Sequence, residues 1–246
     1  MMDLVQKNAS VYNASAQSWE DAMKTNVGHK YLEKPAMDAE LPGTLEDKEV
    51  LSIGVGTGDE LKEILKRNPA RVVGIDISRE LLKIAAQKYP TVEFKEMDMT
   101  QMDFADEEFD VVYSSLTFHY ALDWDVLLKE IKRVLKKGGT LLFSTHNPQY
   151  WGLKPATGNE HSNGRGITLK EHTALLPGDV AITFYNHPSQ DSIKEALEHA
   201  GFSIESFFTP KVIEAEVHND EKEKYEELKT KNSSIPLFLI VKATKP

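Results

Sequence analysis

Three glycines at alternate positions follow an apolar segment and precede two acids, in the run Val50-Leu-Ser-Ile-Gly-Val-Gly-Thr-Gly-Asp-Glu60. Because glycine lacks a Cβ atom, Gly54, Gly56 and Gly58 permit positive φ and close approach of a ligand to the main chain. The spacing is G-x-G-x-G, which differs from the G-x-G-x-x-G of dinucleotide-binding proteins. Asp59 and Glu60 begin the next helix, where carboxylates complement the helix dipole but repel a phosphate. The pattern therefore predicts a nucleoside ligand without a phosphate.

Two histidines, His119 and His146, follow the fourth and fifth predicted strands. Ligands of parallel sheets bind outside the carboxyl ends of the strands, and an imidazole there can take a proton from a substrate. We expect His119 to act as a general base, with a rate that rises through an apparent pKa near the ordinary histidine value. A hydrogen-bonded loop histidine without a chemical role is the alternative for His119 and the preferred interpretation of His146.

The glycine turn is the first of five motifs that follow one another along the chain. The other four are Val72–Ser78, Val92–Met99, Phe109–Tyr120 and Arg133–Ser144. With these motifs the chain resembles the class I S-adenosylmethionine-dependent methyltransferases, in particular small-molecule enzymes of the type 11/25 kind, over most of its length. The resemblance implies that S-adenosylmethionine is the cofactor and that a methyl group moves by in-line displacement.

The resemblance also implies roles for residues at the strand ends. Asp76 would accept hydrogen bonds from both ribose hydroxyls, and Asp98 would accept one from the adenine amino group. The loop after the fourth strand would lie beneath the methionine moiety, and His119 would face or orient the methyl acceptor. The cofactor contacts implied outside the N-terminal segment are Gly54, Val55, Gly56, Gly58, Asp76, Ile77, Asp98, Met99 and Ser115.

One position departs from the family pattern. Members commonly carry an acid two residues before the first glycine, where this chain has Ser52. That acid is the usual route for recognising the methionine ammonium. We expect Asp59, or the carbonyl groups of Ser114 and Ser115, to take its place.

The segment before the first strand contains two predicted helices with several aromatic residues. In related small-molecule methyltransferases such helices fold over the cofactor. We expect Tyr12 to close on the sulfonium side and Lys30 to pair with the methionine carboxylate. The alternative is that Trp19 and Tyr31 only pack and that Lys30 is solvated.

The composition narrows the class of protein. The chain has 246 residues and no cysteine, which excludes disulfides, thiolate zinc sites and a cysteine nucleophile, and we expect no metal site. A formal net charge of -10 argues against a nucleic-acid partner, whose phosphates need many lysines and arginines. No secretory signal or membrane-spanning run is evident. We expect a cytoplasmic monomer or homodimer.

Apolar periods alternate between strand and helix, which predicts a Rossmann-like, doubly wound α/β fold. We expect seven strands, mostly parallel, with an antiparallel last strand, in a single methyltransferase domain over 1–246. A helix beginning after Asp123 should end at Gly138-Gly139. The predicted parts are an N-terminal helical lid (1–48), a cofactor-binding core (49–145), an inserted substrate cap (146–188) and C-terminal core strands and helix (189–246).

The predicted cap differs in composition from the rest of the chain, because it is rich in glycine, asparagine, histidine and proline. Gly166–Leu169 and Val180–Phe184 are expected to pair as an antiparallel ribbon over the active-site end of the sheet. Tyr150, Trp151 and Tyr185 would then select the acceptor without affecting cofactor affinity.

The fourth-strand loop, Ser114-Ser115-Leu116-Thr117, lacks the Asn/Asp-Pro-Pro-aromatic signature of enzymes that methylate planar exocyclic amines or glutamine amides. Together with the low basic content, this loop favours a small-molecule acceptor. Two alternatives remain open. One is a tRNA or protein methyltransferase that uses a local basic patch, and the other is a non-catalytic S-adenosylmethionine-binding module that regulates a partner.

Overall fold

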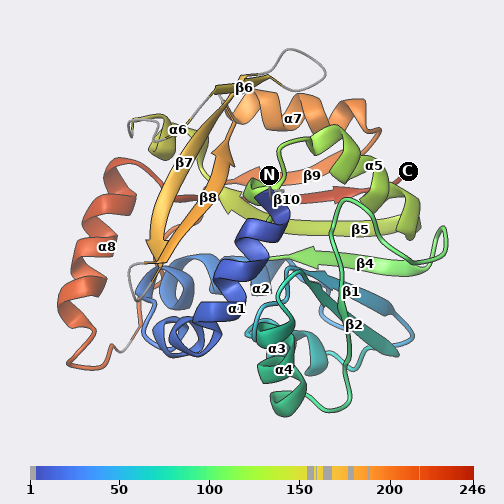
Figure 1. The fold of residues 1–246 in the computed structure, drawn as a ribbon, viewed down its shortest axis with the longest axis horizontal. Coiled ribbons are helices and arrows are strands. Elements are labelled where there is room, and N and C mark those ends of the chain that lie inside the picture. The colour runs from blue at the N-terminus through green and yellow to red at the C-terminus, as the bar shows by residue number, and fades with distance from the viewer. Residues whose placement is uncertain are drawn as a thin grey trace.

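A seven-stranded sheet is the centre of the fold (Figure 1). The computed structural model describes residues 4–153, 158, 160–162, 168–176, 180–187, 189–215 and 217–246. The strands of this sheet lie in the order β3-β2-β1-β4-β5-β10-β9. Their bounds are β1 (Glu49–Ile53), β2 (Arg71–Asp76), β3 (Glu93–Glu96), β4 (Phe109–Ser114), β5 (Leu135–His146), β9 (Ser203–Phe208) and β10 (Phe238–Thr244).

The strand directions are those of a doubly wound sheet with one reversal. β1 to β5 pair in parallel, whereas β10 pairs antiparallel with both β5 and β9. The predicted fold class and the antiparallel last strand are therefore confirmed. β10 lies between its two partners, so the edge of the sheet is formed by β9.

Helices pack on both faces of this sheet. Because alternate strand residues point to opposite faces, Leu51 joins the core cluster of α5 and α7, whereas Val50 packs with α2 and α3. No helix in the described part of the chain is long and apolar enough to cross a membrane. The bounds are α1 (Leu4–Met23), a π-helix η1 (His29–Glu33), α2 (Lys34–Glu40), α3 (Leu61–Leu65), α4 (Arg79–Lys88), a 3-10 helix η2 (Phe118–Tyr120), α5 (Trp124–Val134), α6 (Pro148–Gly152), α7 (Gln190–His199) and α8 (Lys222–Ser234).

The helix α5 begins as predicted but ends earlier. The Asp123 side chain caps it by accepting from the backbone N–H groups of Asp125 and Val126. Its last residue is Val134, and Gly138-Gly139 lies inside β5, so the prediction that the glycines end the helix is wrong. Leu135 already has an extended backbone and pairs with Phe109 of β4, which draws the chain into the sheet four residues before Gly139.

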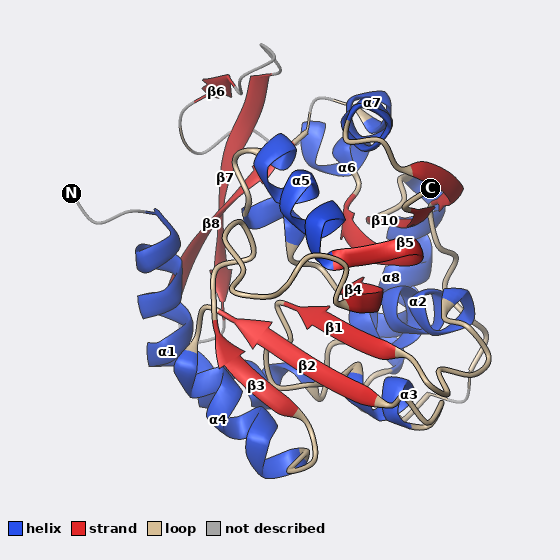
Figure 2. Cartoon of the chain, turned by 90° about the vertical axis from the view of Figure 1, so that its right-hand side faces the viewer, coloured by secondary structure: helices blue, strands red, loops and turns tan. Residues whose placement is uncertain are grey.

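A smaller sheet is formed by β6 (Glu160–Ser162), β7 (Thr168–Leu176) and β8 (Val180–Asn186). Lys170–Leu176 pairs antiparallel with β8, whereas Thr168 and Leu169 pair with β6. The predicted ribbon therefore exists with a shifted first strand, and Gly166 and Ile167 lie outside the described residues. Figure 2 shows the arrowheads of β1, β2 and β3 pointing toward α1 and the β7–β8 ribbon.

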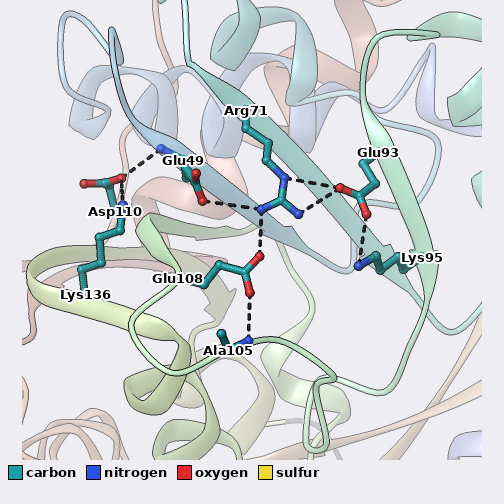
Figure 3. A network of polar contacts seen from close by, with 8 residues as sticks. All are labelled: Glu49, Arg71, Glu93, Lys95, Ala105, Glu108, Asp110 and Lys136. Carbon is teal, nitrogen blue, oxygen red and sulfur yellow. Dashed lines mark hydrogen bonds and ion pairs between the residues drawn. The ribbon is translucent and has the colours of Figure 1, made fainter.

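The opposite, amino-terminal ends of the strands are joined by a charged network (Figure 3). The Arg71 guanidinium donates to Glu108 at 2.7 Å and to Glu93 at 2.9 Å, and lies 3.5 Å from Glu49. Asp110 accepts from the backbone N–H of Glu49 at 3.0 Å. These partly exposed pairs contribute little individually, but they connect the starts of β1, β2, β3 and β4.

Candidate functional site

A cavity of about 560 Å³ lies at the carboxyl ends of the central strands, under α1 and β8. Its size is within the usual range for small-molecule sites. The structure brings ten of the predicted site residues to its wall. They are Tyr12, Gly54, Val55, Gly56, Asp76, Ile77, Asp98, Met99, Ser115 and His119.

The glycine turn forms one wall of the cavity. The N–H groups of Gly54 and Val55 both donate to the Ile75 carbonyl, at 2.8 and 3.0 Å, which holds the turn against β2. Gly54 and Gly56 have φ of +67° and +51°, and a Cβ on Gly56 would meet nothing within 4 Å. A ligand can therefore approach the main chain at Gly56.

Gly58 is a predicted cofactor contact that does not line the cavity. Its φ is +83°, and a Cβ there would lie 2.9 Å from Leu61 and 3.0 Å from Tyr89. The glycine is required by the turn and by close packing against α3 and α4. Its predicted role at the ligand is corrected accordingly.

Asp76 is held in place by the main chain around it. Its Oδ2 accepts from the Gly56 N–H at 2.9 Å, and its Oδ1 accepts from the Ser78 N–H at 2.8 Å. Burial raises the pKa of Asp76 to about 6, against the effect of these hydrogen bonds. Each oxygen keeps a lone pair, so the carboxylate can accept from two neighbouring hydroxyls of a ligand.

Asp98 lines the cavity just beyond β3, beside Met99. Its Oδ1 accepts from both the N–H and the hydroxyl of Thr100, at 2.8 and 2.7 Å. These two bonds fix the carboxyl group. Its other oxygen can accept a hydrogen bond from a ligand amino group.

A buried acid contacts the serine at position 52. The Ser52 hydroxyl donates to Glu60 Oε1 at 2.5 Å, and Glu60 is 7% exposed and lines the cavity. Burial raises the pKa of Glu60 to about 7. From the sequence, Glu60 was expected only to complement the helix dipole, and Asp59 or the carbonyl groups of Ser114 and Ser115 were expected to take the place of the acid. The missed signal was a strand hydroxyl followed eight residues later by an acid that the turn folds back onto it.

Lys30 is not among the residues that line the cavity. Its Nζ lies 2.9 Å from Glu221, and the Tyr31 hydroxyl donates to the same carboxylate at 2.7 Å. The structure therefore does not bring Lys30 to a ligand carboxylate, and that prediction is corrected. The ion pair with Glu221 satisfies the ammonium at the start of α8.

His29, which precedes Lys30, does line the cavity. Its Nδ1 lies 2.8 Å from Glu33 Oε2, and Glu33 is completely buried. The other oxygen of Glu33 accepts from the hydroxyls of Ser115 and Ser144, at 2.9 and 2.5 Å. Burial opposes charge on both members, yet Glu33 raises the pKa of His29, and His29 with the two serines lowers the pKa of Glu33.

His119 and His146 also line the cavity, but they contact rings and no acid. Their ring centroids are 3.8 Å apart at an interplanar angle of 13°, and both pack against the edge of Phe184. Neither Nδ1 has a hydrogen-bond partner among the described residues. Burial lowers the pKa of His119 well below its ordinary value and that of His146 to about 3. The expected titration of His119 near the ordinary histidine pKa is therefore corrected.

Tyr12 closes the cavity from the N-terminal side. Its hydroxyl lies 2.5 Å from that of Tyr120, and its ring meets Trp19 edge to face. Burial, together with the Asp76 charge, raises the pKa of both tyrosines. The hydroxyl pair joins α1 to η2 beside Asp76.

Acids predominate among the ionisable groups of the cavity wall. The described lining residues include no lysine or arginine, whereas five acids are present: Asp59, Glu60, Asp76, Asp98 and Asp123. Such a wall favours a ligand with positive charge.

Comparisons with known proteins agree with this geometry. Residues 51–143 match a protein-family model described as a methyltransferase domain. A demethylmenaquinone methyltransferase from Chlorobaculum parvum is 40% identical over 100 residues, which are 41% of this chain and 41% of that protein. A malonyl-[acyl-carrier protein] O-methyltransferase from Hamiltonella defensa is 30% identical over 139 residues, 56% of this chain and 51% of that protein. The chain thus spans about half the length of the curated relatives it matches.

The fold is also found among solved structures. An S-adenosylmethionine-dependent methyltransferase from Mesorhizobium loti superposes with a TM-score of 0.65. The sequence identity is 24%, and the superposition covers 85% of this chain and 96% of that one. At this identity the likeness establishes the fold.

Proposed function

The chain carries a class I S-adenosylmethionine-dependent methyltransferase domain, and we propose that it transfers a methyl group from S-adenosylmethionine to a small-molecule acceptor. The observation that carries this proposal is the cavity at the carboxyl ends of β1, β2 and β4, with Asp76 fixed at its wall and five acids around it. S-adenosylmethionine has a sulfonium and an ammonium against one carboxylate, so its net positive charge suits that wall.

The residues present fit this cofactor. We assign Asp76 to the ribose hydroxyls, because both of its oxygens are already oriented by backbone N–H groups. Asp98 is assigned to the adenine amino group, and Gly56 to the close approach of the nucleoside. Glu60, together with Ser52, is assigned to the methionine ammonium. Related enzymes commonly carry an acid at the position of Ser52, and Glu60 is the buried carboxylate that contacts this serine.

S-adenosylmethionine supplies an activated methyl group, so the protein mainly has to hold the acceptor in line with it. The Tyr12–Tyr120 pair and residues of β8 form part of the cavity wall. Burial lowers the pKa of His119 and of His146, and a neutral imidazole can exchange a hydrogen bond with an acceptor hydroxyl. His119 takes the proton where the reaction requires its removal.

The acceptor side of the cavity favours a flat, uncharged molecule. The rings of Trp151, Phe184 and His146 pack against one another there, with centroids 4.7 to 5.0 Å apart. A malonyl-type acceptor has a free carboxylate, for which the described wall offers no lysine or arginine. A flat quinone-type ring, of the kind that the name of the demethylmenaquinone relative indicates, therefore fits better.

The first test is calorimetry with adenosylhomocysteine and NAD. Asp76→Ala should weaken adenosylhomocysteine binding by about 1.5–3 kcal/mol, because it removes hydrogen bonds to a charged group. Asp106→Ala, which alters an exposed acid paired with Arg133, is the matched control and should bind normally. Unchanged affinity in folded Asp76→Ala, or tight NAD binding without adenosylhomocysteine binding, would contradict the assignment.

The acceptor class is tested by incubating the protein with methyl-labelled S-adenosylmethionine and cell extract. Label in small molecules is the expected result. Label in RNA or protein would show the macromolecular alternative. Cofactor binding without any labelled product would indicate a non-catalytic binding module.

A further inference from the structure

A cofactor carboxylate in the cavity requires a positively charged or hydrogen-bonding partner, and few residues of the wall can supply one. If the proposed function holds, the bound cofactor brings one carboxylate at its amino-acid end. Among the lining residues that the structure describes there is no lysine or arginine, and Lys30 is engaged by Glu221. Three histidines remain, namely His29, His119 and His146.

Only one of these histidines is built to hold a positive charge. His119 and His146 stack on each other, so a proton on either would be buried beside a second imidazole without an acid. His29 instead lies 2.8 Å from the Glu33 carboxylate through Nδ1. Both of its ring nitrogens are buried and make no hydrogen bond to the described chain, so the contact with Glu33 is an ion pair. Its side chain is 12% exposed and lines the cavity.

The position of Glu33 is fixed from the sheet side. The Ser115 and Ser144 hydroxyls, at the ends of β4 and β5, donate to its Oε1. Both members of the pair belong to the π-helix η1, a rare conformation that is frequent at functional sites. The ion pair thus stands where the carboxyl ends of β4 and β5 meet the cavity.

We propose that His29, held by Glu33, is the anion site of the cavity and binds the carboxylate of the cofactor's amino-acid end. This inference rests on the proposed function. The site makes cofactor binding pH-dependent, because His29 binds the carboxylate only while it is protonated. In this assignment His29 is a binding residue and Glu33 a positioning residue.

The charged groups around His29 favour that protonated form. Glu33 on the same π-helix contacts it directly, and Asp59, from the glycine turn, contributes a second negative charge. Lys34, at the start of α2, opposes them, but its ammonium donates to the Asp59 carbonyl and lies 3.7 Å from Asp38. The balance raises the pKa of His29, so the proton is retained to higher pH than on an ordinary histidine and is lost as the pH rises further.

The experiment compares adenosylhomocysteine with methylthioadenosine, which keeps the nucleoside thioether but lacks the amino-acid end. Calorimetry at about pH 6 and about pH 8.5 is done on the wild type and on His29→Gln. At the lower pH the substitution should weaken adenosylhomocysteine binding about tenfold to a hundredfold and leave methylthioadenosine unchanged. At the higher pH the adenosylhomocysteine affinities of the two proteins should converge. The ratio of the wild-type affinity to the His29→Gln affinity at each pH cancels the titration of Glu60 and Asp76, because both proteins contain these acids.

Two further variants separate the site from a structural effect. Glu33→Gln keeps an acceptor for both serine hydroxyls but removes the charge, so the loss of affinity with pH should move to lower pH. His161→Gln is the matched control, because His161 makes a similar 2.7 Å contact with Glu171 away from the cavity wall. It should bind both ligands as the wild type does.

The outcomes are distinct. If neither ligand binds the wild type, the proposed function fails. If both bind, but His29→Gln retains full adenosylhomocysteine affinity at about pH 6, the anion site is overturned. Equal weakening of both ligands would also overturn it, because it would place His29 at the nucleoside or in the packing. If His29→Gln does not fold, an unchanged pH dependence in Glu33→Gln overturns it.

Discussion

Two histidine sites border the same cavity and have opposite surroundings. His29 lies against a buried carboxylate, and its pKa is raised, whereas His119 lies flat against His146, and its pKa is lowered. The side chain is the same in both cases, and both places are largely shielded from water. The difference comes from the neighbour: an acid stabilises imidazolium, whereas a second neutral ring leaves the desolvation penalty uncompensated. A histidine at a strand end therefore does not by itself indicate an ordinary titration.

The comparison also separates two tasks within one cavity. The His29 side can hold charge and suits an ionic group of the ligand. The His119 side stays neutral and is surrounded by Trp151 and Phe184, which suits a flat, uncharged molecule. The most informative tests replace a residue on one side of the cavity and measure stability, turnover or ligand affinity to see whether the other side is affected.

Removing the acid should have the largest effect. Glu33→Ala leaves His29 and the hydroxyls of Ser115 and Ser144 without their buried partner, so we expect a loss of about 3–5 kcal/mol in the free energy of unfolding. Chemical denaturation followed by circular dichroism measures it. Glu46→Ala, at an exposed acid, should change stability by less than about 0.5 kcal/mol. An equally small loss for Glu33→Ala would remove the distinction between the two histidine sites.

Truncating the neutral side should affect turnover and leave the ligand affinity intact. If His119 takes a proton in the transition state, His119→Ala should lower kcat by about 10²-fold or more, with adenosylhomocysteine affinity nearly unchanged. Single-turnover kinetics with the acceptor found by labelling measures the chemical step. Burial lowers the pKa of His119. We therefore expect no increase in wild-type turnover around the ordinary histidine pKa that disappears in His119→Ala. Such a rise would mean that the neutral assignment is wrong.

The smallest effect is the pH dependence of stability that the His29–Glu33 pair contributes. The raised pKa of His29 gives stability that is present below its unfolded value and lost as the pH rises through the folded value. The lowered pKa of Glu33 gives stability that is present above its unfolded value and lost as the pH falls through the folded value. The difference in unfolding free energy between the wild type and Glu33→Gln should therefore be largest in mildly acidic solution and shrink in alkaline solution. A constant difference across this range would contradict the ion pair.

The sequence by itself determined the architecture and the family. The order of five motifs predicted a class I methyltransferase domain with an antiparallel last strand, and both predictions are confirmed. This was possible because the signals are local: a strand period, a glycine turn and a helix start each lie within about ten residues. The same locality explains why most predicted wall residues, such as Gly56, Asp76 and Asp98, do line the cavity.

The tertiary structure alone decided which charges meet. Lys30 pairs with Glu221 and Gly58 packs on Tyr89, and neither contact is specified by the spacing along the chain. The end of α5 at Val134 was likewise fixed by pairing of Leu135 with β4 and not by the glycines. A pKa depends on the partners and the burial of a group, and these are set by contacts between segments far apart in sequence. The sequence therefore supplied the histidines, but only the fold raised the pKa of His29 and lowered that of His119 and His146.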